Sequence, residues 1–100
     1  MRTSDEFVAS MRAVLATERD AIRRLDSAAV DRASRAKEAL LAEVLGTDAA
    51  QRSPLLEGLS VVRDELKRNL VLLAHARDCL RDALLHAQPD GVGARISIHL

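Results

Sequence analysis

The scarcity of helix-breaking residues constrains this chain more than any other feature of its sequence. Among 100 residues, glycine and proline occupy only six positions, and neither occurs between Ser4 and Leu45. A second uninterrupted stretch follows Gly58 and ends at Gln88. Alanine, leucine and arginine, which all favour helix, are abundant throughout. The sequence therefore predicts an all-α fold made of long helices.

Capping residues indicate where these helices begin and end. Thr3 and Glu6 have the spacing of a capping box, and Gly46 is a typical residue for a helix stop. Ser53 and Pro54 resemble an N-cap followed by the first residue of the next helix. The expected units are helices over about 4–45 and about 54–87, a bundle over 1–88 and a C-terminal tail over 89–100.

One internal boundary stays open. Asp26 could act as the N-cap of a new helix that begins near Ala28. The apolar face continues across Asp26 without glycine or proline, which favours one long helix, straight or kinked, over two helices split near residue 26.

Apolar residues in the second stretch recur at alternating intervals of four and three. This 3.5-residue period is typical of coiled coils, so we expect an elongated antiparallel bundle or hairpin of two to three long helices with coiled-coil-like packing. The expected seam of the second stretch is Leu55, Leu59, Val62, Leu66, Asn69, Leu73, Ala76, Leu80, Ala83 and Ala87. That of the first stretch is Val8, Met11, Leu15, Glu18, Ile22, Leu25, Ala29, Ala33, Ala36, Leu40 and Val44.

Two polar residues interrupt the seams. Asn69 could fix helix register or oligomeric state, or it could lie where solvent reaches the seam. Glu18 either pairs with an arginine of the second stretch or lies at a solvent-exposed edge of the bundle. The candidate partners of Glu18 are Arg63, Arg68 and Arg77.

The second stretch carries more apolar residues than one seam requires. Val71 and Leu85 are two heptads apart, so they lie on one line of the helix, outside the seam. We expect this line, with Leu84, Ile96 and Ile98, to bind a partner protein. The alternative is that the first stretch splits and its two helices bury both sides of the second.

Composition excludes several classes of function. Fifteen basic and fifteen acidic residues give a formal charge of zero, which argues against binding nucleic acid or an anionic membrane. The only aromatic residue is Phe7, so base-stacking surfaces are excluded. Cys79 is the only cysteine and cannot form an internal disulfide. No apolar run reaches the length of a membrane span, so no membrane insertion is expected.

Enzymatic and metal chemistry have little support in the sequence. The nucleophile-elbow, P-loop and dinucleotide motifs are all missing, so we expect no enzyme activity and no cofactor. The one metal-like pattern is His75, Cys79, Asp82 and His86. These four share a helical stripe about 16 Å long, too long to converge on one ion, and we interpret them as a polar rim.

Two segments resemble the FlgN family of flagellar export chaperones. In that family an aspartate is followed about ten residues later by lysine and then by a leucine pair; Asp26, Lys37 and Leu40-Leu41 match this pattern. The segment 66–73, with basic residues and Asn69 before a leucine pair, is similar to the family's last long helix. Residues 18–22 fit as well, and the resemblance spans about residues 15–86.

The resemblance implies a cytoplasmic type III secretion chaperone without metal or ATP. Such chaperones hold hook-filament junction proteins before export and bind helical cargo segments mainly through their C-terminal region. Two other functions remain as alternatives. The chain could be a structural or adaptor coiled-coil domain that forms a homodimer, or, more remotely, a helical metal-binding protein.

Overall fold

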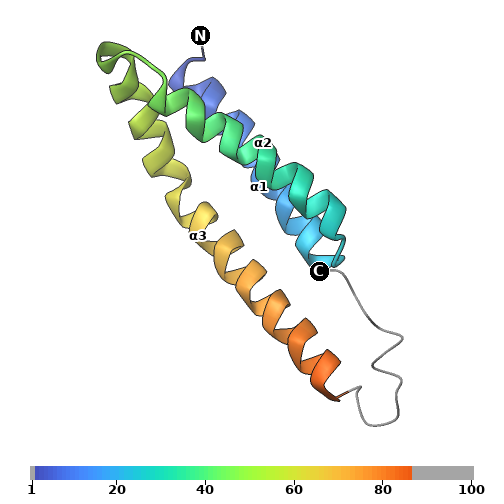
Figure 1. Ribbon diagram of the computed structural model, residues 1–100. Coiled ribbons are helices and arrows are strands. Elements are labelled where there is room, and N and C mark those ends of the chain that lie inside the picture. The colour runs from blue at the N-terminus through green and yellow to red at the C-terminus, as the bar shows by residue number, and fades with distance from the viewer. Residues whose placement is uncertain (1, 87–100) are drawn as a thin grey trace.

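Residues 2–86 of the computed structural model are described, and they form three helices (Figure 1). Helix α1 spans Ser4–Arg23, α2 spans Ser27–Leu45 and α3 spans Ala49–His86. Successive helices run in opposite directions, so α1 and α3 are parallel and α2 is antiparallel to both. No strand occurs in this part of the chain, and the all-α prediction is confirmed. The expected tail over 89–100 and the last expected seam residue, Ala87, lie outside the described residues.

The chain breaks between α1 and α2, so the favoured expectation of one helix over residues 4–45 is wrong, and the split near residue 26 that the sequence left open is observed. Leu25 has a φ of 54°, in the left-handed region. The Asp26 N–H donates to the Ala21 carbonyl at 3.0 Å, and the Leu25 N–H donates to the Ile22 carbonyl at 3.0 Å. These two bonds form a Schellman motif, in which the left-handed residue is usually glycine. With leucine in its place, the motif gives no glycine signal in the sequence.

Two other predicted boundaries hold and one does not. The capping box is confirmed, since the Glu6 N–H donates to Thr3 Oγ1 at 3.1 Å and the Thr3 N–H to Glu6 Oε1 at 3.3 Å. Gly46 caps the C-terminus of α2, as expected. The predicted N-cap at Ser53, with the helix starting at Pro54, is wrong, because α3 begins at Ala49. Pro54 therefore lies inside the helix, where it costs one backbone hydrogen bond near the N-terminus.

Helix α1 is the centre of the molecule and packs against both α2 and α3, which make few contacts with each other. Leu15, Val62 and Asn69 confirm the predicted seams, whereas Leu25, Ala36 and Ala83 are exposed. Phe7, which the seam prediction omitted, is fully buried. The buried apolar cluster consists of Phe7, Met11, Leu15, Leu40, Val44, Leu55 and Val62.

A glycine allows α3 to approach α1 closely. A Cβ atom added at Gly58 would lie 3.2 Å from Val8 Cγ2 and 3.3 Å from Phe7 Cδ2. Neither atom has room for such a neighbour without moving. Gly58 thus allows α3 to pack directly against the buried Phe7 ring.

Helix α3 is longer than the two helices beside it. Its contacts with α1 are offset in sequence by just over fifty residues, as in the 2.9 Å pair of Arg12 and Glu65. On this offset Arg23, the last residue of α1, lies level with about residue 76, and α3 continues beyond it (Figure 1). The molecule measures 61 × 19 × 18 Å. Its radius of gyration of 17.5 Å exceeds the roughly 13 Å of a compact 100-residue domain.

Candidate interaction surface

A buried polar cluster joins all three helices. Glu18 of α1 is only 1% exposed and accepts hydrogen bonds from Ser34 Oγ at 2.9 Å and Lys37 Nζ at 2.8 Å, both on α2. Asn69 of α3 donates through Nδ2 to Glu18 Oε1 at 3.0 Å and to the Leu15 carbonyl at 2.8 Å. We call these four residues, Glu18, Ser34, Lys37 and Asn69, the Glu18 cluster.

The Glu18 cluster corrects the expected pairing of Glu18. Its cationic partner is Lys37 and not an arginine of α3, because the break at Leu25 folds α2 back along α1. Asn69 is 1% exposed, so the alternative of a solvent-reached Asn69 is also wrong. Burial alone would raise the pKa of the Glu18 carboxyl, but hydrogen bonds from Lys37, Asn69 and Ser34 outweigh it and hold that pKa below its ordinary value.

The three residues matched to the family pattern have structural contacts. Lys37 and Asn69 meet at Glu18. Asp26 lies apart from them and caps α2, since its Oδ1 accepts from the Ala29 N–H at 3.0 Å. These contacts give all three residues a role in holding the helices.

The line predicted to bind a partner is open to solvent where it is described. Val71 is 68% exposed and Leu85 is 62% exposed, while Leu84 is half-buried. Ile96 and Ile98 lie outside the described residues. The split of the first stretch therefore does not bury both sides of α3, because α2 packs mainly on α1. Within residues 2–86, the exposed large aliphatic side chains of α3 are Leu56, Val61, Leu70, Val71 and Leu85.

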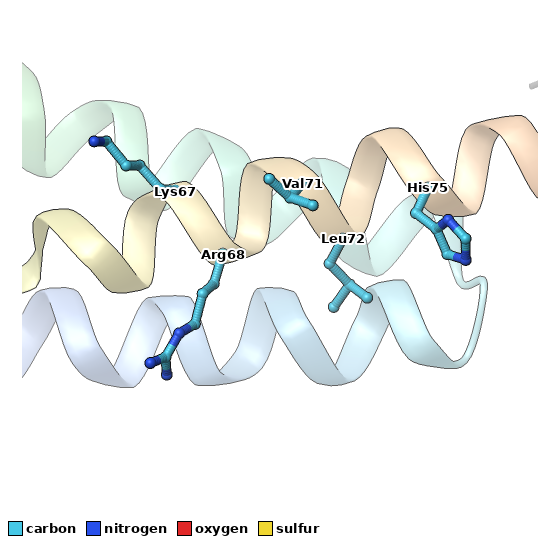
Figure 2. A pocket seen from close by; sticks show the side chains of 5 residues that line it. All are labelled: Lys67, Arg68, Val71, Leu72 and His75. Carbon is cyan, nitrogen blue, oxygen red and sulfur yellow. The ribbon is translucent and has the colours of Figure 1, made fainter.

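A shallow pocket of about 430 Å³ lies in the middle of this surface. Figure 2 shows the side chains that line it, all from two turns of α3. Val71 and Leu72 form its apolar centre, Lys67 and Arg68 lie on its N-terminal side, and His75 lies on its C-terminal side. We call these five residues the α3 patch. Sequence reasoning placed Val71 here but missed the two cations, although their position one turn before Val71 was readable from the 3.6-residue period.

The metal-like residues do not gather into a site. His75 Nε2 and Cys79 Sγ are 3.7 Å apart on adjacent turns, and both residues are exposed. His86 Nδ1 lies 2.8 Å from the Asp82 carbonyl oxygen of its own helix. No group of three or more potential ligands comes together among the residues of the three helices that the structure describes.

None of the helices described here is long and apolar enough to cross a lipid bilayer. Comparisons of the chain with protein-family models, with curated proteins and with solved structures found no match. The residues of the chain and their geometry are therefore the basis for assigning a function.

Proposed function

We propose that this chain is a cytoplasmic type III secretion chaperone of the flagellar system. In this proposal it binds hook-filament junction proteins through apolar surface on α3 and prevents their premature aggregation. The observation that carries the proposal is the apolar side of α3, which α1 and α2 leave uncovered in residues 49–86. The similarity of the segments around Asp26, Lys37 and Asn69 to the FlgN family supplies the class of cargo.

The mechanism in this proposal is the burial of one helix against another. A cargo segment that presents an apolar stripe would lie along α3 and cover Val71, Leu72 and Leu85. Each large aliphatic side chain that becomes fully buried contributes about 1.5–3 kcal/mol. The same contact would remove the cargo's own apolar stripe from water, which is how a chaperone of this kind prevents aggregation.

The test uses the purified chain and a co-expressed hook-filament junction protein. Val71→Asp and Leu85→Asp should each reduce co-purification of the cargo at least about tenfold, because an ionised carboxylate resists burial in an apolar contact. Both variants should melt within a few degrees of wild type, since both side chains are exposed. Leu45→Asp, at a 77% exposed site on α2, is the matched control and should leave binding unchanged.

Two results would contradict the proposal. If both aspartate variants unfold, these side chains belong to a core, and α3 has no open surface. If the cargo does not bind and the wild-type chain forms a tight dimer that Val71→Asp dissociates, the adaptor coiled-coil alternative replaces the chaperone.

A further inference from the structure

The α3 patch carries positive charge that the rest of the described chain does not neutralise. Lys67 and Arg68 are exposed, and neither forms an ion pair within residues 2–86. Two nearby carboxylates are engaged elsewhere, Glu65 with Arg12 at 2.9 Å and Asp78 with Arg81 at 2.7 Å. Asp64, one turn before Lys67, forms no ion pair with either cation within residues 2–86 and does not line the pocket. Of the five described residues that line the pocket, none is a carboxylate.

We infer that the α3 patch binds an acidic amphipathic helix, with aliphatic side chains on Val71 and Leu72 and carboxylates on Lys67 and Arg68. This inference deepens the proposed function, on which it rests, because it gives the chemistry of the partner. The patch follows the helix axis from Lys67 to His75, about 12 Å, which matches roughly two turns of a partner helix.

A second copy of the chain fits the α3 patch poorly. An antiparallel pair of α3 helices centred between Val71 and Leu72 would place Arg68 of each copy opposite His75 of the other, and Lys67 beside them. Such a pair places the four lysine and arginine side chains around its centre and offers no carboxylate opposite any of them. Opposite charge on the partner stabilises the contact and speeds its formation, whereas like charge opposes both.

The experiment measures binding of two synthetic helical peptides of about 20 residues to the full chain by fluorescence anisotropy. The peptides share one leucine stripe and differ only in flanking residues, glutamate in one and lysine in the other. The wild-type chain should bind the glutamate peptide about tenfold more tightly, and the difference should shrink at high salt.

Charge reversal gives the decisive comparison. The double variant Lys67→Glu/Arg68→Glu should lose about tenfold in affinity for the glutamate peptide and gain affinity for the lysine peptide. The control Arg32→Glu/Arg35→Glu reverses two exposed charges on α2 and should change neither affinity. Val71→Asp should weaken binding of both peptides, because both use the apolar centre of the patch.

Several outcomes would overturn the inference. They are equal binding of the two peptides, no binding of either, an unchanged preference in the double variant, or binding of anionic phospholipid vesicles in place of the peptides. A dimer that buries Val71 would also overturn the inference.

The experiments distinguish failure of this inference from failure of the proposed function. If the chain binds the glutamate peptide but not the junction protein, only the proposal of a flagellar cargo is wrong. If the chain binds the junction protein equally well after charge reversal, only the inference of an acidic partner is wrong.

Discussion

Glu18 is a buried acidic residue that depends on hydrogen-bond partners for its stability in the folded chain. A carboxylate 1% exposed to solvent would be strongly destabilising if it lacked partners, and here two groups from α2 and one from α3 satisfy it. Lys37, its ionic partner, is 23% exposed at its side chain and keeps part of its hydration. The pair therefore lies at the edge of the core, where the cost of burying charge is moderate.

The hydrogen bonds of Glu18 make part of the stability depend on pH. Because they hold the folded-state pKa of Glu18 below its ordinary 4.5, the unfolded chain takes up the proton more readily. The stabilisation is complete above about pH 4.5 and is lost as the pH falls through the folded-state pKa. Glu18→Gln should remove this component and lower the free energy of unfolding at pH 7 by about 1–3 kcal/mol. Urea unfolding at a series of pH values measures both effects.

A surface carboxylate provides the control for Glu18. Glu43 pairs with Arg2 at 2.8 Å, and both side chains are substantially exposed. Glu43→Gln should change the free energy of unfolding by less than about 1 kcal/mol. If Glu18→Gln were equally mild, or if its unfolding kept the acid dependence of wild type, the Glu18 cluster would contribute no more than an exposed ion pair.

At the scale of the helix, the turn at Leu25 carries backbone strain. A left-handed conformation costs a residue with a Cβ about 1–2 kcal/mol, whereas glycine adopts it without that cost. Leu25 is 54% exposed, so little packing is lost when its side chain is removed. Leu25→Gly should therefore raise the free energy of unfolding by about 0.5–1 kcal/mol, after the greater freedom of glycine in the unfolded chain is subtracted.

Thermal and urea unfolding of Leu25→Gly beside Leu25→Ala separate strain from side-chain loss. Alanine keeps the Cβ and the strain, so only the glycine variant should gain stability. A glycine variant no more stable than the alanine variant would mean that residue 25 is not left-handed in solution.

Helix type and most of the core could be predicted from the sequence, because a 3.5-residue apolar period and glycine-free stretches are local patterns. This period predicts Leu15, Leu55 and Val62 in the core, and all three are buried. The α1–α2 turn could not be predicted with the same rule, since its left-handed position holds leucine and its only signal was Asp26. The partners of Glu18 were missed for the same reason, because they depend on where α2 returns.

The exposed surface was only partly predictable. Val71 and Leu85 followed from counting apolar residues against the capacity of one seam, and both are exposed. The contribution of Lys67 and Arg68 depends on which charges find partners in three dimensions. Spacing along one helix does not show that Glu65 is engaged by Arg12.

For the whole molecule, the unequal helix lengths predict unequal stability. Beyond about residue 76, α3 has no neighbouring helix within the described chain, and an isolated helical segment of about ten residues is marginal in water. Backbone amides of residues 78–86 should exchange with deuterium at least about tenfold faster than those of residues 7–22. Hydrogen exchange read by mass spectrometry or NMR measures this difference.

Protein concentration is the control for that measurement. If residues 78–86 are protected at high concentration and lose protection on dilution, a second copy covers the end of α3. Equal protection of both segments at every concentration would contradict the view that this end lacks a tertiary partner.

The position of α1 between the other helices has a consequence for the order of folding. Contacts of Glu18 with α2 close loops of 16 and 19 residues, whereas its contact with Asn69 closes one of 51. Short loops close at a lower entropic cost, so the α1–α2 hairpin should form before α3 docks. Substitutions in the α1–α2 contact should then mainly slow folding, and those in the α1–α3 contact should mainly accelerate unfolding. During synthesis on a ribosome, the α1–α2 hairpin would thus be paired before α3, the helix with the exposed aliphatic side, is complete.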